Sequence, residues 1–154
     1  MNQLTFELED APGLVGRTFE VGEFQISRTE RDVFEAITMI SQDYPEPSLP
    51  EFPVGIVEGF HVLSLIDALS TRAFRFNPER VYGFNYGLDR VRFIEPIRIG
   101  EPLRFGFEVT EVREKGEGYL IRRDCRIEPV EASARISFAA DWLSLILPSR
   151  GPGG

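Results

Sequence analysis

The segment VEGFHVLSLIDALSTRAF, residues 57–74, decides the fold. It predicts a helix that is apolar on nearly every side, with large apolar residues at Phe60, Val62, Leu63, Leu65, Ile66, Leu69 and Phe74. A helix without a polar face is expected to be buried on all sides. The rest of the domain must therefore wrap around it. Its few polar residues become informative, and they are Glu58, His61, Ser64 and Asp67.

Four strand-like segments follow this helix, at 86–97, 102–114, 118–128 and 132–146. Pro or Gly turns separate them, including KGEG at 115–118, which predicts a hairpin. In the second segment one face carries Leu103, Phe105, Phe107 and Val109, and in the fourth one face carries Ala134, Ile136, Phe138 and Ala140. A period of two is typical of a half-buried antiparallel strand.

Before the helix, residues 17–27 predict a strand and residues 28–41 a helix. Thr29 and Asp32 resemble a capping box, and one stripe of this helix carries Val33, Ile37 and Ile40, with Phe34 beside it. The proline-rich loop SQDYPEPSLPEFP follows at 41–53. This order predicts an α+β fold with a long antiparallel sheet around a buried central helix. We expect one domain over residues 1–147 and a disordered tail at 148–154.

Composition excludes several classes of protein. The chain has 154 residues, 42% of them apolar, which is enough for the core of one domain. Its net charge of −8 argues against a general nucleic-acid binder and against a polybasic membrane contact. The single cysteine, Cys125, allows no internal disulfide.

The N-terminal stretch MNQLTFELED has neither the basic start nor the apolar run of a signal peptide. No apolar run approaches the ~20 residues that a membrane-spanning helix needs. We therefore expect a soluble, cytoplasmic protein.

Three stretches share the pattern of a known family: TMISQDYPEP (38–47), IVEGFHVLSLIDAL (56–69) and VRFIEPIRIGEPLRF (91–105). The positions that match are Asp43, Gly59, Phe93, Pro96, Ile97, Gly100 and Glu101. On these residues the chain resembles the MaoC-like hydratases and dehydratases of the hotdog fold, from about Arg17 to Ile146. The stretch at 91–105 is the most specific of the three.

The resemblance implies an activity on acyl thioesters carried by coenzyme A or an acyl carrier protein. Relatives add or remove water across the double bond beside the thioester carbonyl. An aspartate and a histidine in the loop handle the water and the proton, and the N–H of the helix-opening glycine, here Gly59, holds the thioester oxygen. The resemblance also implies a homodimer or a heteromer with a related subunit, with no metal and no cofactor of its own.

The catalytic loop departs from the family pattern. Pro45 and Ser48 stand where the family has asparagine and histidine, and Glu58 stands where it has the histidine before the glycine. Only Asp43 and Gly59 are carried over. The one histidine of the chain, His61, gives the hypothesis of a relocated Asp43–His61 pair. The alternative is a core histidine whose hydrogen bonds are satisfied.

Other site residues also have two interpretations. Asp43 is either catalytic or part of a turn. Glu58 is either a helix N-terminal acid or the base of a thioesterase. Tyr86, with Asn85, either lines the acyl pocket or forms a turn with Gly87.

Ser64 is a candidate substrate contact on the central helix. Asp67 is expected to be buried and paired, with Arg72 or with the hydroxyl of Ser64 or Ser70. The arginines at 90, 92, 98 and 104 predict a solvated face, from which one or two contact a carrier phosphate.

Three functions remain open from the sequence. The first is an enoyl-thioester hydratase or 3-hydroxyacyl-thioester dehydratase with an altered site. The second is another reaction on the same scaffold, either thioester hydrolysis by Glu58 or a cyclisation or dehydration in secondary metabolism. The third is a non-catalytic subunit that binds acyl groups or partners a complete homologue.

Overall fold

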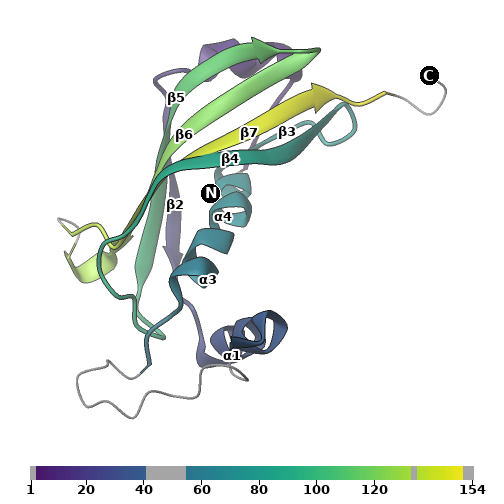
Figure 1. Ribbon diagram of the computed structural model, residues 1–154. Coiled ribbons are helices and arrows are strands. Elements are labelled where there is room, and N and C mark those ends of the chain that lie inside the picture. Colours follow the sequence, from purple (N-terminus) through teal and green to yellow (C-terminus); the bar gives the residue numbers. More distant parts are fainter. Residues whose placement is uncertain (1–2, 41–54, 133–134, 151–154) are drawn as a thin grey trace.

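A computed structural model describes residues 3–40, 55–132 and 135–150 (Figure 1). Its body is a five-stranded antiparallel sheet in the order β2-β5-β6-β7-β4. The strands are β2 (Thr18–Phe24), β4 (Val81–Phe93), β5 (Leu103–Lys115), β6 (Gly118–Pro129) and β7 (Phe138–Pro148). Helices α3 (Gly59–Ser64) and α4 (Ile66–Ala73) run end to end across one face of the sheet. The predicted hotdog arrangement, a long sheet around a central helix, is confirmed.

Smaller elements complete the fold. Strand β1 (Leu4–Phe6) pairs in parallel with β3 (Phe74–Phe76), and two 3-10 helices lie at η1 (Leu8–Leu14) and η2 (Val130–Ala132). Helix α1 (Arg28–Thr38) lies beside α3 (Figure 1). In the described part of the chain, no helix has the length and apolar character needed to cross a bilayer.

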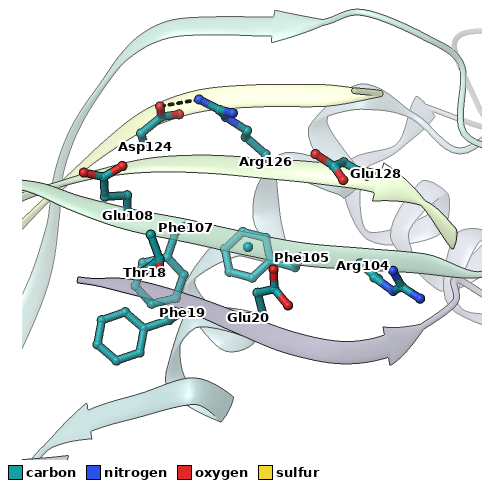
Figure 2. Close-up of a pocket in the computed structure, with 11 residues that line it drawn as sticks. Thr18, Phe19, Glu20, Arg104, Phe105, Phe107, Glu108, Asp124, Arg126 and Glu128 are labelled. Carbon is teal, nitrogen blue, oxygen red and sulfur yellow. Dashed lines mark hydrogen bonds and ion pairs between the residues drawn. The ribbon is translucent and has the colours of Figure 1, made fainter. Parts of the chain in front are cut away.

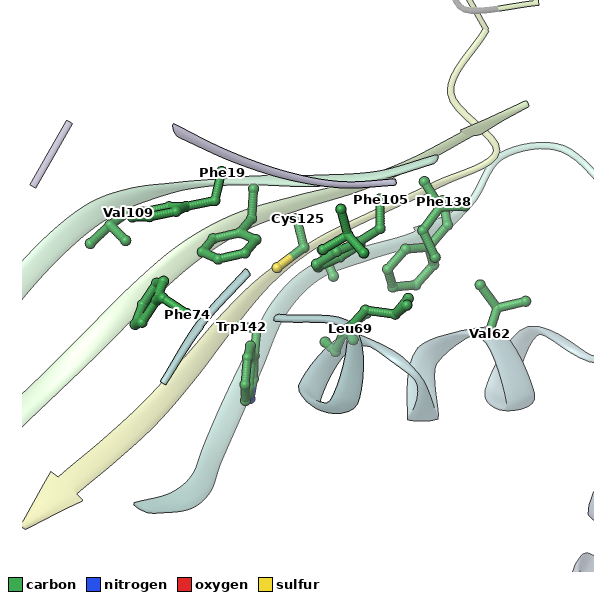
Figure 3. Close-up of a cluster of buried hydrophobic side chains, with 14 of the residues drawn as sticks. Phe19, Val62, Leu69, Phe74, Phe105, Val109, Cys125, Phe138 and Trp142 are labelled. Atoms are coloured by element: carbon green, nitrogen blue, oxygen red, sulfur yellow. The ribbon is translucent and has the colours of Figure 1, made fainter. Parts of the chain in front are cut away.

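The core fills the space between the sheet and α4 (Figure 3). The alternation predicted in β5 is confirmed, because Leu103, Phe105, Phe107 and Val109 are all buried. Phe138 is fully buried on β7. Cys125 lies among these side chains with no exposed surface, and burial raises the pKa of its thiol to about 12.

The prediction of one helix over 57–74, buried on all sides, is wrong in two respects. The helix breaks at Leu65, where the N–H donates to the Val62 carbonyl and the preceding Ser64 hydroxyl donates to the His61 carbonyl at 2.7 Å. The helices are buried toward the sheet and, at His61, against α1, but not on every side, and Phe60 is 69% exposed. Asp67 is exposed as well, so the prediction that it is buried is wrong and its carboxylate needs no buried partner.

Helix α1 is capped differently from the prediction. The capping box is Ser27 with Glu30 instead of Thr29 with Asp32, and the Glu30 N–H donates to the Ser27 hydroxyl at 3.2 Å. None of its residues is fully buried, and Val33 and Ile37 are exposed. The apolar stripe of α1 therefore does not contribute to the main core.

Strands β4 and β7 differ from their predicted boundaries, 86–97 and 132–146. Strand β4 already begins at Val81, so Asn85 and Tyr86 lie inside a strand and the predicted turn with Gly87 is wrong. Strand β7 begins only at Phe138. It runs to Pro148, and the next N–H, that of Ser149, donates to the Arg80 carbonyl at 2.7 Å. Ordered structure therefore extends beyond the expected boundary at 147.

A charged network fixes a distortion in β4. The register with β7 shifts between Asp89 and Arg92, and Arg90 between them has a left-handed φ of 49°. The Arg90 guanidinium donates to both oxygens of the buried Asp141 carboxylate, at 2.7–3.0 Å. Arg122 donates to Asp141 at 3.0 Å and to Asp89 at 2.8 Å. Arg90 lies on a solvated face as predicted, with its side chain 76% exposed, and it also pairs with Asp141.

Candidate functional site

Gly59 opens helix α3, as predicted. The first α-helical hydrogen bond runs from the Val62 N–H to the Glu58 carbonyl at 3.2 Å. The N–H groups of Gly59, Phe60 and His61 therefore have no acceptor one helical turn back. A Cβ atom on Gly59 would lie 2.8 Å from the Phe93 ring, so any other residue at this position would force that ring to move. Whether the Gly59 N–H binds a thioester oxygen stays a prediction.

Glu58 forms a cluster with two residues of α1. Its side chain makes no capping bond, and its Oε1 lies 3.4 Å from Arg31 Nε. Arg31 Nη2 also lies 2.6 Å from Glu35 Oε1. A hydrogen bond with Glu58, followed by burial, raises the pKa of Glu35. The Glu35 carboxyl group is therefore easier to protonate than an ordinary glutamate.

His61 is buried, with 6% of its surface exposed. Its ring stacks on Phe34 of α1, with centroids 4.5 Å apart and planes 7° from parallel. Burial lowers the pKa of His61, and the nearby Glu30 carboxylate partly opposes this. Nδ1 is buried and has no hydrogen-bond partner among the described residues. Asp43, its hypothetical partner, lies outside those residues, so the Asp43–His61 pair stays a prediction.

His61 makes stability depend on pH in one direction. Its pKa is lowered in the folded state, so the unfolded chain takes up a proton first as the pH falls below 6.5. We expect the wild-type free energy of unfolding to fall across this range. In His61→Phe, which preserves the stack on Phe34, this part of the decrease should be missing. Urea unfolding at about pH 7.5 and about pH 5.5 tests this. An equal decrease in the free energy of unfolding in the two proteins would contradict it.

Two pockets flank the central helices. The α4–β4 pocket, about 300 Å³, has a wall formed by Ser64 and Asp67 from the helices and by Asn85, Tyr86, Leu88 and Trp142 from the sheet. The α1–α4 pocket, about 420 Å³, includes His61, Phe34 and Ser64. The structure therefore brings Tyr86 to the α4–β4 pocket and His61 to the α1–α4 pocket, and Ser64 lines both.

A third depression, about 260 Å³, lies on β2, β5 and β6 (Figure 2). It is on the sheet face away from the helices, above Gly106, which has no side chain to fill it. Charged residues surround it, including Asp124 and Arg126, which pair at 2.9 Å. Its lining includes Arg104, one of the four arginines predicted to contact a carrier phosphate, but none of the predicted catalytic or thioester-binding residues, so we do not assign the catalytic site there.

The sequence reasoning did not identify Arg123, which lies on the core face of β6 with 5% of its surface exposed. The signal was present in the alternation, because Arg123 shares its face with Ile121, Cys125 and Ile127, which are all buried. Among the described residues, no three or more His, Cys, Asp and Glu side chains are grouped to hold a metal ion.

Comparison with known proteins agrees with this architecture. Residues 47–124 match the model of the MaoC like domain. The chain is 31% identical over 145 residues to nodulation protein N of Rhizobium leguminosarum bv. viciae, covering 90% of each protein.

Solved structures share the fold at low sequence identity. The monoamine oxidase regulatory protein from Archaeoglobus fulgius has a TM-score of 0.73 at 16% identity, with 97% of this chain and 99% of that chain covered. The (R)-hydratase from A. caviae has a TM-score of 0.62 at 18% identity, with 84% and 94% covered. By its family match and by its curated relative, the chain belongs to the MaoC-like domain family.

Proposed function

We propose that the protein is an acyl-thioester hydratase or dehydratase with an altered active site. The observation that supports this most is Gly59, which opens the central helix where the family has its glycine and is packed directly against Phe93. Its N–H is placed to donate to the thioester oxygen, where negative charge develops in an enolate. The substrate is an acyl group on coenzyme A or an acyl carrier protein.

The proton-transfer roles fall to His61 and Asp43. In hydration, a base takes a proton from water, the hydroxide oxygen bonds to the β-carbon, and an acid gives a proton to the α-carbon. His61 suits the role of base because its lowered pKa keeps the ring neutral at neutral pH. Asp43 is the acid: its carboxyl group gives a proton to the α-carbon and then regains one from the His61 ring, which took it from water. Dehydration uses the same groups in reverse.

Thioester hydrolysis is the second candidate, and one observation favours it. Glu58 directly precedes Gly59, and its Oε2 is buried without a hydrogen-bond partner among the described residues unless Glu35 is protonated. A carboxylate at this place can activate water against a carbonyl whose oxygen is held by the Gly59 N–H.

The assay separates these reactions. With crotonyl-coenzyme A, hydration removes the absorbance of the conjugated double bond, whereas hydrolysis releases a free thiol. We expect the first result, reduced by about 100-fold or more in His61→Phe. Gly59→Ala should also lose activity, while Gly22→Ala, whose added methyl meets no atom within 4 Å, should retain it. Thiol release alone would favour Glu58 chemistry, and no reaction over a range of chain lengths would favour a non-catalytic subunit.

We also propose that the protein forms a dimer through β4. This strand has 13 residues and pairs on one side with β7, with no second partner strand in the described structure. Tyr82 and Phe84 on it are 44% and 55% exposed. Long apolar strand edges are normally covered. Sedimentation should give twice the monomer mass, and Phe84→Lys should lower it to the monomer value; a monomeric wild type would overturn this proposal.

A further inference from the structure

The α1–α4 pocket lies between helix α1 and the central helices, and its volume is about 420 Å³. Most of its wall is apolar, with Val33, Phe34 and Ile37 from α1 on one side and Leu65, Ala68 and Leu69 from the central helices on the other. Val33 and Ile37 are 52% and 75% exposed, so they lie outside the main core. The apolar stripe of α1 thus forms one side of a pocket instead of a packed contact.

Contacts near the start of α3 hold α1 in place as this wall. The Phe34 ring stacks on the His61 ring, with centroids 4.5 Å apart. Arg31 Nε lies 3.4 Å from Glu58 Oε1, which links α1 to the residue before Gly59. The two sides of the pocket are therefore joined at the end where Gly59 opens the helix, and the pocket is formed before any ligand binds.

Three titratable side chains line this pocket: Glu30, His61 and Arg72. One oxygen of Glu30 already accepts hydrogen bonds from the N–H and the hydroxyl of Ser27, both at 2.7 Å. Arg72 lies in the last turn of α4. His61 is 6% exposed, and its Nδ1 has no hydrogen-bond partner among the described residues. It is also the titratable residue of this wall that belongs to α3, the helix that Gly59 opens.

The position of His61 decides between the two pockets beside the central helices. Among the described residues, His61 lines the α1–α4 pocket and not the α4–β4 pocket, whose wall carries the Asp67 carboxylate instead. In hydration, the base must lie within ~3 Å of the water that attacks the β-carbon. With His61 as the base, the reacting end of the acyl group must enter the α1–α4 pocket. The rest of the chain then lies along Ala68 and Leu69.

We propose that the α1–α4 pocket binds the acyl group, and that the substrates are thioesters of apolar chains long enough to pass Ala68. Ala68 follows His61 by seven residues, which is about 10 Å along a helix. A butenoyl group is too short to reach Ala68, and a decenoyl group is long enough. This inference rests on the proposed function for the role of His61, whereas binding of the chain needs no reaction.

Two neighbouring residues on α4 provide matched variants. Both are exposed, and of the two pockets Ala68 lines the α1–α4 pocket and Asp67 the α4–β4 pocket. Ala68→Phe should fill the first pocket and Asp67→Phe the second.

The binding probe is S-decyl-coenzyme A, a thioether that can be neither hydrated nor hydrolysed, and free coenzyme A is its reference. By calorimetry, we expect the wild type to bind the decyl compound at least about tenfold more tightly than coenzyme A, a difference of about 1.4 kcal/mol. Asp67→Phe should retain this preference, and Ala68→Phe should lose it. If Ala68→Phe does not fold, Val33→Phe fills the same pocket from α1.

Chain length gives a second measurement. For decenoyl-coenzyme A, kcat/KM should fall at least about tenfold in Ala68→Phe and stay unchanged in Asp67→Phe. For crotonyl-coenzyme A it should be unchanged in both variants, because four carbons do not reach Ala68. A variant that had merely lost its fold would lose both substrates.

Trp142 tests the location of the chain directly. It is the only tryptophan of the protein, and it lines the α4–β4 pocket. Bromine quenches the fluorescence of a tryptophan that it touches. A saturating concentration of ω-bromodecyl-coenzyme A should therefore leave the fluorescence of Trp142 unchanged.

Quenching of Trp142 would overturn the proposal, and so would equal binding of S-decyl-coenzyme A and coenzyme A to the wild type. A preference that persists in Ala68→Phe or is lost in Asp67→Phe would overturn it as well. If the decyl compound binds as expected but neither unsaturated thioester reacts, the acyl site stands and the catalytic function fails. If crotonyl-coenzyme A is hydrated while Ala68→Phe keeps the preference, the function stands and the α1–α4 pocket is not the acyl site.

Discussion

Replacing Asp141 by alanine is expected to lower the free energy of unfolding by about 2–4 kcal/mol. The carboxylate has a relative exposure of only 7% and accepts hydrogen bonds from two arginines, Arg90 and Arg122. Removing it leaves both guanidinium groups without their shared acceptor. Arg90 itself is 76% exposed and can be solvated, which limits the loss.

The effect should extend to the α4–β4 pocket. Asp141 accepts hydrogen bonds from Arg90, whose left-handed conformation lies at the register shift in β4, two residues after Leu88. Asp124→Ala is the matched control, because Asp124 lies opposite Asp141 on β6 and, in the described part of the chain, pairs only with the exposed Arg126. It should cost less than about 1 kcal/mol. Urea unfolding measures both, and equal losses would contradict a special role for Asp141.

Gly118→Ala is expected to destabilise the fold by about 3 kcal/mol or more. A Cβ atom at this position would lie 1.9 Å from the carbonyl oxygen of Ile146 and 2.9 Å from its carbonyl carbon. These are backbone atoms of β7, so no side chain can turn away to make room. The first residues of β6 would have to separate from β7, in the middle of the sheet.

Two other glycines serve as controls, because replacing them by alanine causes no clash with the backbone of a neighbouring strand. An added methyl on Gly87 meets no atom within 4 Å, so Gly87→Ala should be nearly neutral in stability. Gly116 has a φ of +62° in the hairpin turn, and Gly116→Ala should cost about 1 kcal/mol through strain alone. Chemical unfolding of the three variants tests whether Gly118→Ala loses most stability, Gly116→Ala less and Gly87→Ala almost none. A small loss at Gly118 would show that the backbones of β6 and β7 can move apart there without much cost.

The sheet was predictable because its signal is local. Apolar residues at every second position, from Leu103 through Phe105 and Phe107 to Val109, place one apolar face on the strand. All four are buried. Burial of the central helix was not predictable in the same way. An apolar residue such as Phe60 says nothing about whether another element covers it, and here it is exposed.

Of the candidate site, the sequence predicted the start of the central helix at Gly59 and the pocket-lining positions of Ser64 and Tyr86. The predicted capping box of α1 was two residues too late. Ser27 and Thr29 are each followed by an acidic residue three positions later, so the sequence offers two equivalent patterns. The predicted turn at Asn85 is wrong because glycine occurs inside strands as well as in turns, and Gly87 lies inside β4. Arg123 was missed because charged residues are usually placed outside, and only its position among Ile121 and Cys125 shows otherwise.

The enclosed thiol of Cys125 has a practical consequence. Only a thiolate attacks a disulfide reagent, and this group is both sealed from solvent and held protonated, with a pKa of about 12. Modification therefore proceeds through molecules in which the centre of the sheet has opened. Because the chain has no other cysteine, the labelling rate at low reagent measures the opening equilibrium, and the plateau rate at high reagent measures opening itself. The wild-type protein thus carries a kinetic probe of its own core.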